Sequence, residues 1–508
     1  MISTKPNSIF KVIGASSLGT LIEWYDFYIF GSLASIIGAQ LFPADAGASA
    51  LINTLAIFAA GFIVRPFGAL VFGRLGDLIG RKHTFLLTLV LMGGSTFLIG
   101  LIPSYSSIGY AAPILVLVLR LIQGLALGGE YGGAATYVAE HAPKGRRGFF
   151  TSWIQTTATL GLFLSLGIIV LAKNLIGTSA FADWGWRIPF LLSILLVGVS
   201  IYIRLKMHES PMFAKLKTEG RISKNPLKES FSKKANFKMV LLALFGATMG
   251  QGVIWYTGQF YAQSFIENTC KVDFNDSRYI LLWAIAFATP FFVVFGAWSD
   301  KVGRKWIMLG GMLLGIVFYR PIYQVFLDKT DLSQVHPTEI KDIATPVITK
   351  MALHTAGDTL VNTSTKITLL NGSTFNKLKV DTVYADPNKP VGHAKEVAKD
   401  KTLTSGTFWL FVALVFFQVI LVTMVYGPIA AFLVELFPTQ IRYTSMSLPY
   451  HVGNGVFGGL VPFIATLIAS FAGATPLSGL WYPIGIATLS FIIGAVYLAN
   501  QTSENIND

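Results

Sequence analysis

The sequence predicts an all-α polytopic membrane protein with twelve transmembrane helices in two six-helix halves. Composition is the first reason: 53% of the 508 residues are hydrophobic and only 13% are charged, about half the charged share of an average soluble protein. The second is a series of apolar runs of about 20 residues each, the length that spans a bilayer as a helix. The third is a sequence motif that recurs in both halves of the chain.

Twelve apolar spans follow one another along the chain, with ends defined to a few residues. The first resembles a signal peptide, but Glu23 and Asp26 interrupt it and no small-residue cleavage site precedes them, so we expect a retained helix. The expected ranges are 12–40, 50–72, 84–102, 113–140, 149–172, 186–204, 238–266, 279–298, 306–327, 405–433, 443–470 and 479–499.

The loops between the spans predict the orientation of the bundle. Lys and Arg gather in the loops after spans 2, 4, 6, 8 and 10, whereas the short loops after spans 1, 3 and 11 contain neither residue. Cytoplasmic loops carry the excess of Lys and Arg, so we expect both termini in the cytoplasm. This topology also explains the net charge of +13, and nucleic-acid binding is not indicated.

A repeated motif supports the division into halves. GRLGDLIGRK at 73–82 recurs as GAWSDKVGRK at 296–305, an offset of 223 (296 minus 73). A weaker pair, EHAPKGRRG from Glu140 and ELFPTQIRY from Glu435, has an offset of 295, so the second half is longer by 72 (295 minus 223) between the two landmarks. The polar segment 328–404 lies in that interval and has close to the required length. Without it, six spans match six, as in parallel repeats related by an axis along the membrane normal.

The segment 328–404 follows span 9, so we expect it on the outer face. Its part TKITLLNGSTFNKLKVDTVYA (365–385) alternates apolar and polar residues and contains Asn-Gly, which predicts short strands and a turn. A tolerated loop decoration is the simpler interpretation, and a solute-filtering or docking role is the alternative. The expected organisation is a six-helix half at 1–204, a cytoplasmic loop at 205–237, three helices at 238–327, the insertion at 328–404 and three helices at 405–500.

The two copies of the motif predict gating residues at the cytoplasmic ends of the helices. Paired glycines permit a tight turn, and the acid between them can accept from helix N-terminal amides or from a neighbouring Arg. Such a clamp holds helix ends together and can break when the halves move. The predicted gating residues, including those of the second pair of landmarks, are Gly73, Asp77, Gly80, Arg81, Asp300, Arg304, Glu140, Arg146, Glu435 and Arg442.

Charged residues inside three spans predict a proton-coupling site. Counted along each helix from its cytoplasmic end, they lie at similar depth near the midplane, where ionisable residues are rare and usually face a partner inside the bundle. Burial disfavours an ionised carboxylate and a nearby Arg favours it, so one acid could gain and lose a proton. Asp26 is the preferred carrier, Glu23 the structural partner of Arg65, and a purely structural ion-pair set is the alternative. The predicted residues are Asp26, Glu23, Arg65 and Glu130.

Span 7 offers uncharged polar groups at the equivalent place. IWYTGQFYAQSF echoes EWYDFYIF, with Ile254 and Thr257 in place of the two acids. Hydroxyl and carboxamide groups beside aromatic rings suit a small polar organic solute, although aromatic residues at this spacing often serve packing alone. His451 is better interpreted as a hydrogen-bonded structural histidine. The predicted solute-binding residues are Tyr25, Tyr28, Arg120, Gln155, Tyr256 and Gln259.

The sequence indicates neither an enzyme nor a cofactor or metal site. Cys270 is the only cysteine, and the histidines of the 328–404 segment lack metal-ligand spacing. We find no nucleophile–base set and no Walker motif. The expected partners are a small solute, protons and the lipid bilayer, with no nucleic acid.

Several motifs resemble those of a known family. GRLGDLIGRK and GAWSDKVGRK resemble the loop 2–3 and loop 8–9 signatures of the major facilitator superfamily, and RLIQGLALGG, from Arg120, resembles its fourth-helix motif. More narrowly, IEWYDFYIFG, GGEYGGAATYVAEHAP, WGWRIPF and ELFPTQIRYTSMSLPYHVGNGVFGG resemble the metabolite:proton symporter family. The resemblance covers both halves. The 328–404 insertion departs from the family pattern, and no long coiled coil follows span 12.

The resemblance implies a major facilitator fold in the cell inner membrane and proton-coupled secondary transport by alternating access. Members of that family carry small carboxylates and zwitterions such as oxoglutarate, citrate, shikimate, proline and betaine. We therefore expect a proton symporter for a small organic carboxylate or zwitterion, functional as a monomer. A proton-coupled efflux antiporter and a sugar porter-like facilitator are the alternatives.

Overall fold

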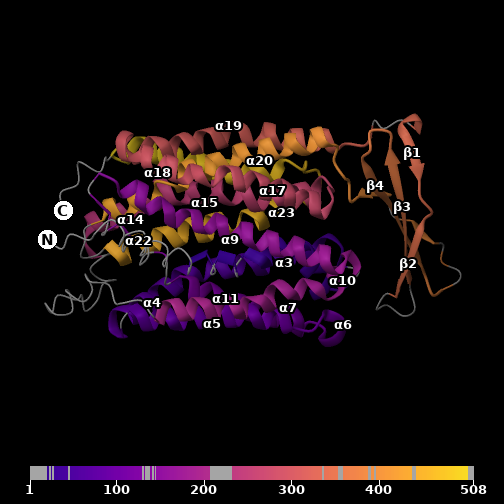
Figure 1. Ribbon diagram of the computed structural model, residues 1–508, viewed down its shortest axis with the longest axis horizontal. Coiled ribbons are helices and arrows are strands. Elements are labelled where there is room, and N and C mark those ends of the chain that lie inside the picture. Colours follow the sequence, from indigo (N-terminus) through magenta and orange to yellow (C-terminus); the bar gives the residue numbers. More distant parts are fainter. Residues whose placement is uncertain are drawn as a thin grey trace.

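The structure is a computed structural model of a bundle of long helices with β-strands at one end (Figure 1). We call the end that carries the strands the sheet end and the opposite end the far end. The residues that it describes are 20–21, 24–25, 28–43, 46–79, 81–128, 131, 135, 138–139, 142–143, 145–205, 232–333, 337–352, 359–386, 389, 391–393, 396–437 and 442–500.

The N-terminal half, which ends at residue 205, occupies one side of the bundle (Figure 1). Helix α7 packs against both α3 and α4, and α5 packs against α11. The helices are α2 Ala34–Leu41, α3 Ala48–Ile63, α4 Arg65–Ile79, α5 Arg81–Leu101, α6 Tyr105–Ile108, α7 Ala111–Leu127, α9 Arg147–Ile176, α10 Thr178–Asp183 and α11 Ile188–Leu205, with a 3₁₀ turn at Gly185–Arg187.

The C-terminal half, which begins at residue 232, forms the other side. Its helices are α14 Lys234–Ala243, α15 Met249–Tyr256, α16 Ala262–Ser264, α17 Phe274–Ala288, α18 Pro290–Val302, α19 Arg304–Thr330, α20 Ser405–Tyr426, α21 Ile429–Leu436, α22 Arg442–Tyr450, α23 Val461–Ala469 and α24 Trp481–Tyr497, with 3₁₀ turns at Pro337–Glu339 and Ser478–Leu480. Four π-helical segments interrupt them: Leu244–Thr248, Thr257–Tyr261, Phe265–Thr269 and His451–Gly458. Such π segments are frequent at functional sites.

The predicted apolar spans are confirmed as helices wherever the chain is described. Three shorter apolar helices, Leu87–Leu101, Ala111–Leu127 and Gly185–Val199, accompany eight that are long and apolar enough to cross a membrane. The eight are Ser49–Phe72, Arg147–Ile176, Lys234–Thr269, Phe274–Val302, Arg304–Thr330, Ser405–Leu436, Ser445–Ala469 and Ser478–Tyr497. Large apolar side chains such as Phe67, Leu171 and Trp298 are exposed on the bundle surface, as a lipid-facing surface requires.

Local sequence explains several helix ends. The carboxylate of Asp273 caps α17 by accepting from the backbone N–H groups of Asn275 (2.8 Å) and Asp276 (3.3 Å), which satisfies donors that have no partner within the helix. Pro290 stands in the first turn of α18. Because proline lacks an N–H group, it divides the long span Phe274–Val302 into α17 and α18.

The first copy of the repeated motif differs from the expected turn. Residues 73–79 continue α4, so Gly73 lies in a helix. A glycine inside a helix costs only about 1 kcal/mol relative to alanine, which helix packing easily offsets. In the second copy the turn is confirmed: Gly303, between α18 and α19, has φ +94° and ψ 160°, a conformation essentially restricted to glycine. Gly80, its equivalent at the offset of 223, lies outside the described residues.

An antiparallel sheet connects α19 to α20 at the sheet end. Its strand order is β1-β3-β4-β5, with β2 also paired to β3 and β6 to β4. β3 and β4 form a hairpin whose register runs from Thr359 opposite Val383 to Thr368 opposite Thr374. Gly372 turns the chain at φ +85°, which confirms the expected strands and turn. The strands are β1 Ile340–Ile343, β2 Val347–Ala352, β3 Thr359–Leu369, β4 Thr374–Val383, β5 Gly392–His393 and β6 Val397–Lys399.

One short stretch after β6 ties the sheet to the bundle. The carbonyl of Lys401 accepts from the backbone N–H of Asp273 (2.8 Å), and its Nζ donates to the carbonyl of Thr330 (2.5 Å). The backbone N–H of Leu403 donates to Asp276 Oδ2 (3.1 Å). Since Thr330 ends α19 and Lys401 leads into α20, the chain leaves the bundle and returns to it at one place. Helix α19 also continues past the expected boundary at residue 328.

Candidate functional site

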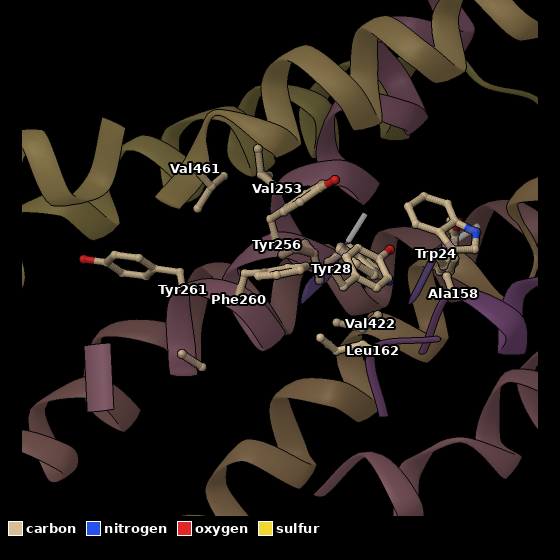
Figure 2. Packing of buried hydrophobic residues seen from close by; sticks show 14 of the residues in the cluster. Trp24, Tyr28, Ala158, Leu162, Val253, Tyr256, Phe260, Tyr261, Val422 and Val461 are labelled. Atoms are coloured by element: carbon tan, nitrogen blue, oxygen red, sulfur yellow. The ribbon is translucent and has the colours of Figure 1, made fainter. Parts of the chain in front are cut away.

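The two halves meet at the centre of the bundle through aromatic side chains. The ring of Tyr28 lies 5.5 Å from that of Trp255 and 5.0 Å from that of Phe260, and the rings of Phe62 and Tyr256 lie 5.1 Å apart. These distances join centroids of rings that belong to different halves. Figure 2 shows Tyr28, Tyr256 and Phe260 gathered in one cluster. The predicted site residues Tyr28 and Tyr256 therefore lie at the interface between the halves.

Arg65, the first residue of α4, lies at the same interface and is only 2% exposed. Its guanidinium carbon is 4.2 Å from the ring centroid of Phe62 and 5.6 Å from that of Trp24. Its aliphatic part faces the other half, because a Cβ built on Gly455 would stand 3.4 Å from Arg65 Cδ. The charge interacts electrostatically with Tyr28, Tyr256, Tyr426, Tyr450 and His451.

A second central contact between the halves stacks Tyr131 on Tyr450. Their ring centroids are 3.6 Å apart and the ring planes differ by 4°. Gln155 Nε2 donates to the Tyr131 hydroxyl (2.5 Å), while the Tyr450 hydroxyl bonds that of Tyr426 (2.7 Å) and accepts from Asn454 Nδ2 (3.1 Å). The predicted residue Gln155 therefore borders the interface. The two stacked tyrosines are absent from the sequence prediction because an aromatic residue in an apolar span is indistinguishable from a packing residue.

Four buried polar side chains of the C-terminal half make no hydrogen bond to any described residue. Gln251, Gln259 and Gln418 are fully buried, and His451 is 2% exposed. Neither side-chain polar atom of the glutamines and neither ring nitrogen of His451 has a partner there. A buried group left in this state costs about 1–3 kcal/mol, so these atoms face water or a solute.

The interpretation of His451 as a hydrogen-bonded structural histidine is wrong within the described part of the chain. The ring lies edge-on to the ring of Tyr450, with centroids 5.3 Å apart. The neighbour in contact is therefore aromatic and offers the ring nitrogens no acceptor or donor.

At the far end, Asp300 of α18 joins the halves. Its carboxylate accepts from the backbone N–H groups of Gly148 (2.8 Å) and Phe149 (2.9 Å), at the start of α9. A negative charge is favoured there because unpaired N–H groups and the helix dipole both point at it. Gly296 permits the approach, since a Cβ built on it would stand 2.7 Å from the Gly148 carbonyl oxygen.

Arg304 extends this far-end lock into the C-terminal half. Its Nη2 lies 2.7 Å from Asp300 Oδ1 and 3.0 Å from Glu435 Oε1, while its Nη1 donates to Ser299 Oγ (2.7 Å). The structure thus brings together three predicted gating residues that lie far apart in the sequence. Their role as a gate stays a prediction.

At the sheet end, a pair that sequence reasoning missed joins the halves. Arg278 is fully buried, and its Nη1 lies 2.9 Å from Glu267 Oε2. Arg278 Nη2 donates across the interface to the carbonyl of Ser32 (2.6 Å), and Ser35 Oγ donates to Glu267 Oε1 (3.1 Å). Both charged residues fall at or beyond the ends of the expected spans 7 and 8, where charge is ordinary and carries no signal. We call this arrangement the sheet-end lock.

Two predicted solute-binding residues make their described contacts inside the N-terminal half. The Tyr25 hydroxyl donates to the carbonyl of Pro189 (2.9 Å). Arg120 donates to Gln123 and to the carbonyl of Phe58, and its guanidinium carbon lies 4.6 Å above the ring of Phe30. Their contact with a solute stays a prediction.

The remaining predicted residues are not brought into the site by the described part of the chain. Asp77 and Arg81 lie in α4 and α5, and Arg442 begins α22. Arg146 is exposed just before α9. Glu23, Asp26, Glu130, Gly80 and Glu140 lie outside the described residues. Among the residues that are described, no cluster of three or more His, Cys, Asp or Glu side chains could hold a metal ion.

Comparisons with known proteins match the chain to transporters. Residues 11–238 match the family described as "Sugar (and other) transporter". The chain is 31% identical over 504 residues to the inner membrane metabolite transport protein YhjE of Escherichia coli, with 98% of this chain and 96% of the relative covered. It is 29% identical over 486 residues to the alpha-ketoglutarate permease of the same organism, with 96% and 92% covered.

A solved structure has a similar fold. The xylose transporter XylE from E. coli, in a partially occluded inward open conformation, superposes with a TM-score of 0.64 at 15% identity, over 97% of this chain and 98% of that chain. At this identity the likeness extends to the fold alone.

Asp300→Asn should loosen the far-end lock. The carboxamide keeps the size of the side chain, but it loses the charge and turns one acceptor toward the amides into a donor. Ser152 is fully buried against Gly296 and can report the opening. With a cysteine at position 152 and Cys270 replaced by serine, a water-soluble thiol reagent should react several-fold faster in the Asp300→Asn chain.

The matched control is Asp328→Asn, which changes an exposed acid bonded to Gln324 at the sheet end. It should leave the reaction rate at position 152 unchanged. Equal rates in the two variants would mean that Asp300 does not hold the far end together.

Glu267→Gln should lower the free energy of unfolding by about 3 kcal/mol, because it leaves Arg278 buried without its opposite charge. The measurement is thermal or urea unfolding of the purified chain in detergent. The control is Glu396→Gln, whose partner Lys377 is 48% exposed; an exposed pair of this kind contributes less than about 1 kcal/mol. A loss for Glu267→Gln no larger than that of the control would contradict a structural role for the sheet-end lock.

Proposed function

The chain belongs to the major facilitator superfamily, among the metabolite transporters that its full-length relatives represent, and from this premise we propose that it is a proton-coupled symporter for a small organic carboxylate or zwitterion. The observation that carries the proposal is Arg65: a cation buried where the two halves meet. A carboxylate that reaches it gains a charge-assisted hydrogen bond in an apolar surrounding, where such bonds are strong. The name of the alpha-ketoglutarate permease agrees with this solute class.

The proposed topology has twelve spans with both termini in the cytoplasm. Eight long and three shorter apolar helices, together with the first helix around residues 20–41, supply these spans. The Lys and Arg of the far-end loops support a cytoplasmic far end, which places the sheet outside. The full-length likeness to an inner membrane protein supports the cell inner membrane. One chain supplies both halves of the site, so we propose that a monomer is functional.

Alternating access is supported by the two locks. The halves are joined at the far end through Asp300 and at the sheet end through Arg278, with the central cluster enclosed between them. Each lock consists of hydrogen bonds and ion pairs that water can replace one by one, so one end can open while the other stays joined. Rocking of one half against the other around a fixed central site is the common mechanism of such folds.

Proton coupling is assigned to the first helix. Asp26 is the proposed proton carrier, with Glu23 as the structural partner of Arg65 and Glu130 at similar depth. The proposal is supported by Arg65, whose guanidinium lies over Trp24, the neighbour of Glu23 in the sequence. Protonation from the outer side would remove a charge before the site closes, which lowers the cost of enclosing the solute in the apolar core.

Asp26→Asn should abolish proton-driven accumulation of solute and leave solute counterflow intact, because exchange of solute needs no net proton transfer. Uptake and counterflow are measured in the same proteoliposomes. Glu23→Gln is the comparison: a structural acid should lose both activities together with folded protein. Normal accumulation and normal pH dependence in both variants would remove the proton carrier from this helix.

Removal of the sheet should leave transport largely intact. Lys401 Nζ bonds the carbonyl of Thr330, so a short Gly-Ser linker can replace residues 334–399 without separating α19 from α20. Uptake by cells should stay within about two-fold of that of the full chain. A complete loss of uptake with normal membrane insertion would show that the sheet belongs to the transport mechanism.

A further inference from the structure

We propose that Gln251, Gln259, Gln418 and His451 form the part of the solute site that recognises hydroxyl or carbonyl oxygens, so that the solute is a hydroxy- or oxo-carboxylate and not a quaternary-ammonium zwitterion. The inference deepens the proposed transport function and rests on it. It selects one solute class where the function leaves two, and it assigns solute contacts to three side chains beyond the predicted Gln259.

The first argument is that these side chains differ from the other buried glutamines of the bundle. All eight polar atoms of the four side chains lack a hydrogen bond to the described residues. By contrast, Gln123 donates to Thr96 Oγ1 (2.7 Å) and Gln155 to the Tyr131 hydroxyl (2.5 Å). The bundle therefore satisfies its structural glutamines and leaves this set open. A site that takes up a polar solute has this property in its empty state.

The second argument is that the four side chains converge on one helix. Gly258, next to Gln259, lies against α20 at Gln418: a Cβ built on it would be 3.2 Å from the Gln418 carbonyl oxygen. Gly252, next to Gln251, lies against the segment of His451, with its built Cβ 2.8 Å from Asn454 Cα. Three helical elements are thus held at close range around residues 251–259, in which the π-helical turn Thr257–Tyr261 carries Gln259.

The third argument is that Arg65 adjoins this set from the other half. Its Cδ is 3.4 Å from the Cβ position of Gly455, in the same π-helical segment as His451, and its charge interacts with the His451 ring. A solute held between them would meet a cation on one side and neutral groups on the other. A carboxylate suits the cation, and the carboxamides and imidazole offer both donors and acceptors. A hydroxyl group uses both kinds of partner, and a carbonyl group uses the donors.

A quaternary ammonium group suits this site poorly. It makes no hydrogen bonds and is recognised by the faces of aromatic rings. Here the guanidinium of Arg65 already lies over the rings of Phe62 and Trp24, and the ring of Tyr28 stacks on that of Trp255. The ammonium would leave the carboxamides unsatisfied and would stand close to a second positive charge.

The experiment compares acids that differ in a single oxygenated group. Binding to the purified full-length chain is measured by calorimetry for malate against succinate, 2-oxoglutarate against glutarate, and citrate against tricarballylate, with glycine betaine, proline and xylose alongside. A site that hydrogen-bonds an oxygen discriminates strongly against an analogue that lacks it. We expect at least one oxygenated acid to bind, and to bind at least about ten-fold more tightly than its partner.

Variants assign the discrimination to the proposed side chains. Gln251→Leu and Gln418→Leu should bring the oxygenated acid to the affinity of its partner while leaving the partner unchanged. The Tm of the empty protein should stay equal or rise, because an unsatisfied buried amide is replaced by an apolar group; a structural glutamine would instead lower it. Gln324→Leu, an exposed change at the sheet end, is the control. Full discrimination in both core variants would mean that these groups hold only water.

The outcomes separate this inference from the proposed function. Binding of glycine betaine or proline, or equal binding within every pair of acids, overturns the inference and leaves the carboxylate or zwitterion symporter standing. Binding of xylose alone overturns the proposed function itself. No response across all the acids overturns the inference on the unmodified protein, without recourse to any variant.

Discussion

The cost of a charge inside an apolar bundle is the constraint on which the rest of the structure depends. Arg65 is buried at the boundary between the halves, where hydrocarbon and aromatic rings surround it. Such a residue persists only where ring faces, hydroxyl groups and the ends of other helices compensate for its lost hydration. The aromatic cluster, the tyrosine stack and the glycines of the interface all lie within reach of this one side chain, and both halves are needed to surround it.

The two ends of the interface are joined by different chemistry. At the far end a carboxylate, Asp300, accepts from backbone N–H groups at the start of a helix. At the sheet end a guanidinium, Arg278, donates to a backbone carbonyl. Both side chains stay paired within their own half, to Arg304 and to Glu267. When either end opens, these charges keep their partners, and water can replace the contacts that are lost across the interface. Opening therefore exposes no unpaired charge, which keeps the cost of alternation low.

Close backbone packing explains where the polar groups of the C-terminal half stand. Glycines at 252, 258, 453 and 455 bring three helical elements closer than side chains would permit. The π-helical turns beside them shift the side-chain register, so that polar residues can face the centre of the bundle. The sheet lies outside this arrangement. It is tied to Asp273 and Asp276 at the start of α17, the helix that also carries Arg278.

The sequence alone determined the helical spans, the two halves, the β hairpin and the trio of Asp300, Arg304 and Glu435, because hydrophobic periodicity and a repeated motif are local properties that survive in one dimension. It also pointed to Arg65 and Gln259, since polar groups in apolar runs stand out. Only the tertiary structure decided that Glu267 and Arg278 join the halves, that Tyr131 stacks on Tyr450, and that Gly73 is helical. These outcomes depend on contacts between side chains as far apart in the sequence as Tyr131 and Tyr450 and on the balance of packing against local preference, which no pattern along the chain records.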